Sequence, residues 1–138
     1  MTKATARWSG YKVKFEIEPA SGHSAAIDED SPLGDDQGMR PTEMLLGALG
    51  ACTGINAVLL LKKFKQPYKS LEVEVEGEQD KEWPRAFNKI DVTFHIAWDG
   101  KHDTKLVEQA LDMACNRYCP IHATLSAGTE IEHHRKDA

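Results

Sequence analysis

The stretch PTEMLLGALGACTGINAVLLLKKFKQP, residues 41–67, decides the fold. Pro41 suits the first position of a helix, and Glu43 suits the positive end of the helix dipole. Nearly every residue from Met44 to Leu61 is apolar or small, and a cluster of lysines follows where cations are favoured. The segment therefore predicts one helix of about 25 residues that is apolar on all sides, which is typical of the buried central helix of a soluble fold.

An apolar run of this length also raises the question of a membrane span. Three glycines dilute the run, as do Thr53 and Asn56, and no second span is present, so we predict no membrane association. The three glycines, at Gly47, Gly50 and Gly54, recur every three or four residues. We expect them to let another backbone approach that face of the helix closely.

The rest of the chain alternates between strand and helix patterns. Residues 71–78 and 87–98 alternate apolar and polar side chains with the period of two that predicts half-buried strands. Similar but shorter patterns predict strands over 4–8, 11–17, 24–28 and 129–133, a loop over 29–40, an amphipathic helix over 103–117 and a helical turn over 119–125. The order of elements predicts an α+β fold in which an antiparallel sheet wraps around the long central helix.

The composition predicts a single globular domain over residues 1–138, with residues 130–138 as a partly flexible tail. Apolar residues make up 41% of the chain and charged residues 28%, which is ordinary for a soluble protein. The formal net charge of −5 argues against nucleic-acid binding, which needs a basic face. Because the start of the chain lacks an apolar leader, we expect a cytoplasmic protein whose three cysteines are reduced thiols.

The cysteines are the residues with the most chemistry to offer. Cys52 lies in the middle of the central helix, where inert packing is the simplest interpretation. Cys119 directly precedes Pro120 and so lies near a helix N-terminus, where backbone N–H groups and the dipole stabilise a thiolate. Cys115 continues the apolar face of its helix, which favours core packing. Together with His122, Cys115 and Cys119 have a spacing that suggests zinc, but Pro120 interrupts the helix between them, and we predict no metal site.

Two segments resemble the OsmC-like family, which includes the osmotically inducible protein C and organic hydroperoxide resistance proteins. Residues 40–53, RPTEMLLGALGACT, resemble the family segment P-x-E-L-L-x-A-x-x-x-C. Residues 118–125, YCPIHATL, resemble its second cysteine segment, C-P-[VI]-x-x-T-L. The segments between them look like the less-characterised branch of the family, and the resemblance extends over roughly residues 5–133.

The resemblance implies an intertwined α+β homodimer that acts as a thiol-dependent peroxidase on organic hydroperoxides or hydrogen peroxide. Carried over by motif, Cys52 is the peroxidatic thiolate and Cys119 the resolving thiol that forms a disulfide with it. An external dithiol then restores the pair. The resemblance implies no metal and no organic cofactor.

The chain departs from the family at the groups that hold the peroxidatic thiolate, a Glu directly after the helix proline and an Arg from an early loop. Here Thr42 follows the proline, and Glu43 lies one residue on, about 100° around the helix. Arg7 and Arg40 are our candidates for the cation, without a motif match. A thiolate buried without a cation reacts slowly. The departures therefore leave open a non-catalytic module that binds a small ligand, or a redox sensor that uses the same thiols.

Overall fold

The computed structural model describes all 138 residues, which divide into two compact units, residues 1–45 and residues 46–138. The first contains a three-stranded antiparallel sheet with the order β1 (Ala4–Trp8), β2 (Phe15–Pro19), β3 (Ala25–Ile27). The second strand begins later than its predicted start at residue 11, because Lys12 lies in a turn with a φ of 49°.

A buried carboxylate organises the loop that follows β3. Asp28 is only 2% exposed, and its side chain accepts hydrogen bonds from the backbone N–H groups of Glu29 at 2.8 Å, Asp35 at 3.2 Å and Gln37 at 3.1 Å. Burial alone would raise the pKa of Asp28, but these three hydrogen bonds outweigh it and hold the pKa below its ordinary value. The loop predicted over residues 29–40 is therefore ordered by one ionised side chain.

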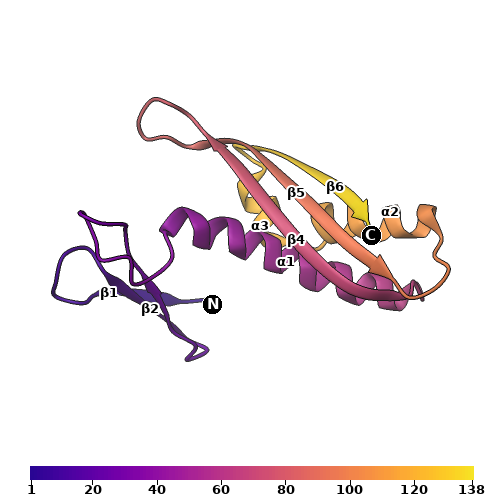
Figure 1. Cartoon of the computed structure of the whole chain (residues 1–138), viewed down its shortest axis with the longest axis horizontal. Helices are drawn as coiled ribbons and strands as arrows, with labels where there is room; N and C mark the ends of the chain where they lie inside the picture. Colours follow the sequence, from indigo (N-terminus) through magenta and orange to yellow (C-terminus); the bar gives the residue numbers. More distant parts are fainter. The chain divides into compact units, whose positions relative to one another are not determined.

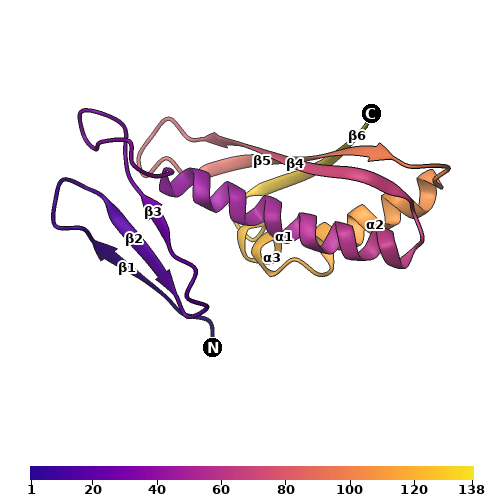
Figure 2. The ribbon, with the colours of Figure 1, turned by 60° about the horizontal axis from the view of Figure 1, so that its bottom comes forward.

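The second unit packs helices on one face of a three-stranded sheet. The helix α1 (Pro41–Lys63) is followed by β4 (Tyr68–Gln79), β5 (Phe87–Trp98), α2 (Thr104–Asn116), α3 (Pro120–Leu125) and β6 (Glu130–Asp137). The strand order is β4-β5-β6 (Figure 1). In Figure 2, α1, α2 and α3 lie on the same side of this sheet. The predicted α+β class is confirmed, and the predicted span of β5 matches its observed bounds.

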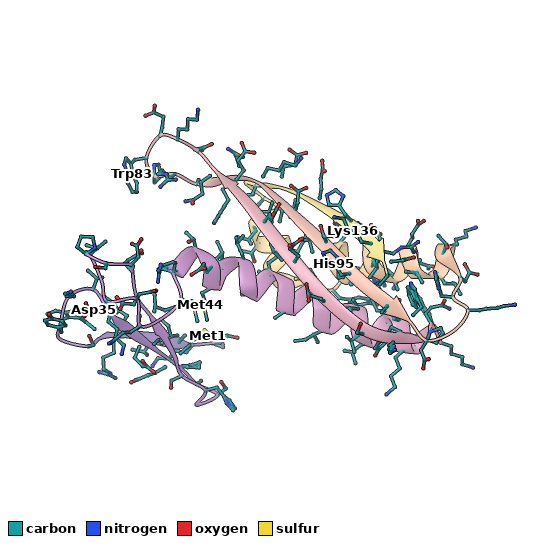
Figure 3. The ribbon with its side chains drawn as sticks, in the orientation of Figure 1. Met1, Asp35, Met44, Trp83, His95 and Lys136 are labelled. Atoms are coloured by element: carbon teal, nitrogen blue, oxygen red, sulfur yellow. The ribbon has the colours of Figure 1, made fainter.

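The core of this unit lies between β5 and the helices. Alternate residues of β5 have no exposed surface, and they cluster with buried residues of α1 and α2, which include Leu49, Leu61, Ile90, Val92, Phe94, Ile96, Val107 and Leu111. The residues between them on β5 are more exposed and belong to the opposite, charged face of the sheet. Figure 3 shows His95 and Lys136 on β5 and β6, and Trp83 at the tip of the β4–β5 hairpin.

The last strand corrects two predictions. β6 pairs parallel to β5, so the sheet is mixed and not purely antiparallel. The physical reason is that α2 and α3 form a crossover between the two strands, which a parallel pair requires. β6 also reaches Asp137, so the flexible tail predicted over 130–138 is instead mostly a paired strand, with His133 and Arg135 half-buried on one side of it.

The long helix is buried on one side only, which corrects the prediction of a helix buried all around. A Cβ added at Gly50 would lie 3.0 Å from Val75 Cγ2, and one added at Gly54 would lie 3.2 Å from Val73 Cγ2, so β4 approaches these glycines closely, as predicted. The opposite side is exposed, with Ile55 at 62% and Leu59 at 61%. By length and apolar composition alone, α1 is the one helix that reaches the size of a membrane span.

Candidate functional site

The three cysteines come together from three helices. Cys52 lies in the middle of α1, Cys115 in the last turn of α2, and Cys119 is the N-cap of α3. All three are free thiols, and they belong to the same core cluster, in which Cys115 and Cys119 are buried and Cys52 is half-buried. The thiols of Cys52 and Cys119 are close enough for the Cys52 side chain to raise the pKa of Cys119, although the two residues are far apart in the sequence.

Cys119 is held by the first turn of α3. Its Sγ accepts a hydrogen bond from the backbone N–H of His122 at 3.3 Å, while Pro120 occupies the first helical position. Burial first, and then the neighbouring Cys52 side chain, raise the pKa of Cys119 to about 11 against the opposing effect of the His122 N–H. The prediction that the helix N-terminus makes Cys119 a thiolate is therefore wrong, because burial outweighs the dipole of so short a helix.

Cys115 packs into the core, as the apolar face of its helix predicted. It is 1% exposed. Burial first, and then the nearby Cys119 and Asp112, raise the pKa of Cys115 to about 12. Both Cys115 and Cys119 therefore keep their protons at neutral pH. Cys52 is the most accessible of the three sulfurs.

Asn56 connects the helix of Cys52 to the segment that carries the other two cysteines. Its side-chain Nδ2 donates a hydrogen bond to the carbonyl oxygen of Ala114 at 3.4 Å. In the sequence, Asn56 is one of the polar residues that dilute an apolar run. Its position one helical turn after Cys52 is the signal for a further role, because a polar side chain in an apolar helix needs a partner.

The three charged residues predicted to support the thiolate have partners within residues 1–45. Arg7 forms an ion pair with Glu18 at 3.1 Å on the surface. Arg40 forms an ion pair with Asp36 at 2.8 Å and donates to the Gly38 carbonyl. Glu43 accepts the backbone N–H of Arg40 at 2.8 Å and so caps the start of α1. None of these hydrogen bonds involves a thiol.

Side chains that could hold a metal converge at one place, which is not the cysteine cluster. Asp91, Glu132 and His134 bring their ligand atoms within 4.8 Å of one another on the charged face of the sheet. The Lys89 ammonium lies 4.0 Å from Asp91 and 3.7 Å from Glu132, so this group already forms a surface ion-pair network. Cys115, Cys119 and His122, the set with zinc-like spacing, do not converge in this way.

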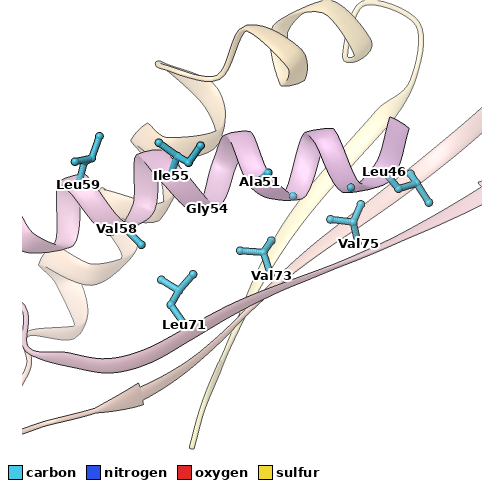
Figure 4. A pocket seen from close by; sticks show the side chains of 11 residues that line it. Leu46, Ala51, Gly54, Ile55, Val58, Leu59, Leu71, Val73 and Val75 are labelled. Carbon is cyan, nitrogen blue, oxygen red and sulfur yellow. The ribbon is translucent and has the colours of Figure 1, made fainter. Parts of the chain in front are cut away.

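An apolar groove runs between α1 and β4 (Figure 4). Its volume is about 560 Å³. Its walls come from small and branched side chains of the two elements: Leu46, Gly47, Gly50, Ala51, Gly54, Ile55, Val58, Leu59, Leu71, Val73 and Val75. Gly47, Gly50 and Gly54 carry no side chain, so the groove reaches the backbone of α1 at these positions. The side chains that line the groove are therefore all apolar, and most of them come from α1, the helix that carries Cys52.

Comparison with known proteins agrees with the two cysteine motifs. The profile described as OsmC-like protein matches residues 34–134. Protein YhfA of Escherichia coli strain K12 is 33% identical over 119 residues, which is 86% of each chain. The chain belongs to the OsmC-like family. The family resemblance of the two motifs is thereby confirmed.

Solved structures confirm the OsmC-like fold. The OsmC-like protein from Mycoplasma pneumoniae has a TM-score of 0.84 at 17% identity, and the match covers 100% of this chain and 97% of that one. The organic hydroperoxide resistance protein OhrB of Bacillus subtilis has a TM-score of 0.64 at 19% identity, with 99% and 98% covered. This OsmC-like chain therefore shares its fold with hydroperoxide resistance proteins.

Proposed function

We propose that this OsmC-like protein is a thiol-dependent peroxidase that reduces organic hydroperoxides or hydrogen peroxide. The observation that carries the proposal is the proximity of the Cys52 and Cys119 thiols, which belong to different helices and meet in the same core cluster. Two cysteines in such contact can pass between the dithiol and the disulfide without large rearrangement of the chain. The fold shared with organic hydroperoxide resistance proteins supports the same chemistry.

The surroundings of the two sulfurs support distinct roles for them. Cys52 is half-buried, so a peroxide reaches it more easily than it reaches Cys119, which is 3% exposed. Cys119, whose pKa is raised to about 11, stays protonated at neutral pH. In our proposal the more accessible Cys52 is therefore the attacking thiol, and Cys119 is the resolving thiol.

The reaction then proceeds in three steps. The Cys52 thiolate attacks one peroxide oxygen, the O–O bond breaks, and the departing alkoxide takes a proton and leaves as an alcohol, while Cys52 becomes a sulfenic acid. The Cys119 sulfur attacks Cys52 Sγ, the S–O bond breaks, and the hydroxyl group leaves as water with the Cys119 proton. An external dithiol reduces the disulfide and is itself oxidised to a disulfide.

We further propose that the working form is a homodimer. The exposed side of α1 carries Leu45, Ile55 and Leu59, apolar side chains that are 37%, 62% and 61% exposed. Together with Ala48 and Cys52 they recur at alternating intervals of three and four residues, the spacing of a helix–helix seam. A second copy covering this stripe would also reach the surroundings of Cys52, where residues 46–138 supply no cation that hydrogen-bonds to it. The molar mass in solution, measured by light scattering, tests this part.

Peroxide consumption by cysteine variants tests the peroxidase. Wild-type protein, given cumene hydroperoxide and dithiothreitol, should consume peroxide catalytically and show a Cys52–Cys119 linkage on peptide mapping. Cys52→Ser should abolish turnover, and Cys119→Ser should stop at the sulfenic acid, which dimedone traps. Cys115→Ser is the matched control and should retain turnover. A Cys52→Ser variant as active as wild type would overturn the proposal.

A second function is favoured by the apolar groove between α1 and β4, which suits a small hydrophobic ligand. In that case oxidation yields no Cys52–Cys119 disulfide, and native mass spectrometry shows a retained ligand. Redox sensing by the same thiols gives the disulfide but negligible steady-state turnover. The experiment above therefore separates the three functions.

A further inference from the structure

Asn56 is placed to act on the cysteine pair without touching the peroxide. It lies four residues after Cys52 on α1, so the two side chains lie on the same side of the helix. Apart from the Cys52 thiol, which interacts with Cys119, only the Asn56 side chain among those of α1 from Leu46 to Leu61 forms a hydrogen bond to another element. The other polar side chain, Thr53, bonds within its own helix, to the carbonyl oxygen of Leu49 at 2.9 Å.

The partner of Asn56 is a carbonyl that the helix itself leaves open. Ala114 lies in the last turn of α2, where carbonyl groups lack intrahelical partners. The N–H of Tyr118, which would continue the helical ladder to Ala114, donates instead to Met113. The Asn56 amide therefore satisfies an otherwise unpaired carbonyl at 3.4 Å. Removing the amide leaves a partly buried acceptor without a partner, which costs more than a solvated hydrogen bond.

This hydrogen bond joins the two segments that carry the reacting sulfurs. Ala114 precedes Cys115, and the chain then turns through Arg117 and Tyr118 into Cys119 at the start of α3. A shift of α1 along α2 would move Cys52 away from Cys119, and the apolar part of the contact resists such a shift through packing. The Asn56 hydrogen bond, one turn from Cys52, adds a directional contact that holds one register.

We propose that Asn56 is a positioning residue for the Cys52–Cys119 pair, because its amide fixes the register of α1 against the end of α2. The inference rests on the proposed function only in taking this pair as the one that reacts. Asn56 acts on the second chemical step, in which the S–S bond forms as the S–O bond of the sulfenic acid breaks and water leaves with the Cys119 proton. The first step, peroxide attack by Cys52, does not depend on the register.

The test compares Asn56→Leu, which removes the amide at similar volume, with Asn56→Gln, which retains the donor. Each purified full-length variant is equilibrated in glutathione buffers of defined composition, and the fraction with the Cys52–Cys119 disulfide is measured by mass spectrometry. Asn56→Leu should lower the equilibrium constant for the disulfide by about tenfold, because misplaced partners lose effective concentration. Asn56→Gln should recover part of it. Asn116→Ala, which removes an amide bonded to Asp112 on the exposed side of α2 at 2.8 Å, is the matched control and should change nothing.

A merely structural role for Asn56 would weaken the reduced and oxidised proteins equally. The unfolding midpoint would then fall while the disulfide equilibrium stayed at the wild-type value, and that result would overturn the proposal. The equilibrium needs no peroxide, so it remains decisive if the wild type proves to have no turnover. After a pulse of cumene hydroperoxide, Asn56→Leu should also form the dimedone-trapped sulfenic acid at the wild-type rate and lose it more slowly. Equal lifetimes of the sulfenic acid would count against the proposal as well.

Discussion

In residues 1–45, Ile27 is the only apolar side chain that is buried, whereas the rest of the buried apolar core lies in residues 46–138. The smaller unit leaves Trp8 55% exposed and Tyr11 65% exposed. Its buried side chain with the most partners is a carboxylate, Asp28, which accepts three backbone N–H groups. The larger unit instead buries alternate residues of β5 completely between helix and sheet.

The comparison shows that two kinds of interaction order the same chain. An apolar core stabilises in proportion to the area it removes from water, so each buried side chain adds to the whole unit. A carboxylate that collects backbone N–H groups instead fixes one loop locally, through directional bonds. Substitutions in the two regions should therefore differ both in how much they change stability and in how far along the chain their effects extend.

The largest effect is expected for Phe94→Ala in the core of the larger unit. Phe94 is the largest fully buried side chain, with 0% exposure. Truncating a buried phenylalanine removes its transfer free energy and leaves a cavity, so the free energy of unfolding should fall by about 3–5 kcal/mol. Urea denaturation followed by circular dichroism measures this. The control is His95→Ala, on the opposite face of the same strand, which removes only a surface pair with Glu74 and should change stability by less than about 0.5 kcal/mol. Similar losses for the two variants would contradict the one-sided core.

Much of this core could be predicted from the sequence. Alternation over residues 87–98 gave the span of β5 and its buried face, because period-two patterning depends only on neighbouring residues. The direction of β6 could not be read in the same way, since parallel or antiparallel pairing depends on where the crossover helices return the chain. The exposed side of α1 was missed for a related reason. Apolar composition predicts that a helix is covered, but it does not say whether its own chain or another molecule covers it.

In the candidate site, too, local features could be predicted from the sequence, whereas features that depend on distant segments could not. The motifs around Cys52 and Cys119 singled out the two residues, and the structure brings their thiols together. Local sequence also suggested a thiolate at Cys119, which was wrong because burial is a property of the assembled core and exceeds the effect of one helical turn. Asn56 escaped notice because its partner, Ala114, is contributed by a distant helix.

A smaller and more local effect is expected for Asp28→Asn in the smaller unit. The neutral amide is a weaker acceptor, so the amide protons of Asp35 and Gln37 should exchange faster with solvent at pH 7, with little change in the core of residues 46–138. Because the pKa of Asp28 is lowered in the folded protein, its stabilising effect is present above the unfolded pKa and is lost as the pH falls through the folded pKa. Hydrogen-exchange protection of these two amides should therefore drop on acidification below about pH 4 in wild type. In Asp28→Asn that step should be absent, and an identical acid step in both proteins would assign it to another carboxylate.

The smallest effects are expected for two glycines on α1, and they test how closely β4 approaches that helix. Alanine favours a helix over glycine by about 1 kcal/mol. A Cβ at Gly47 meets no atom within 4 Å, so Gly47→Ala should raise the free energy of unfolding by about 0.5–1 kcal/mol. A Cβ at Gly50 would lie 3.0 Å from Val75 Cγ2, so the strand must shift, and the propensity gain should be cancelled or reversed. Urea denaturation of both variants under identical conditions measures the difference. Equal stabilisation by the two alanines would mean that β4 yields freely and that the glycines are not needed for its packing against α1.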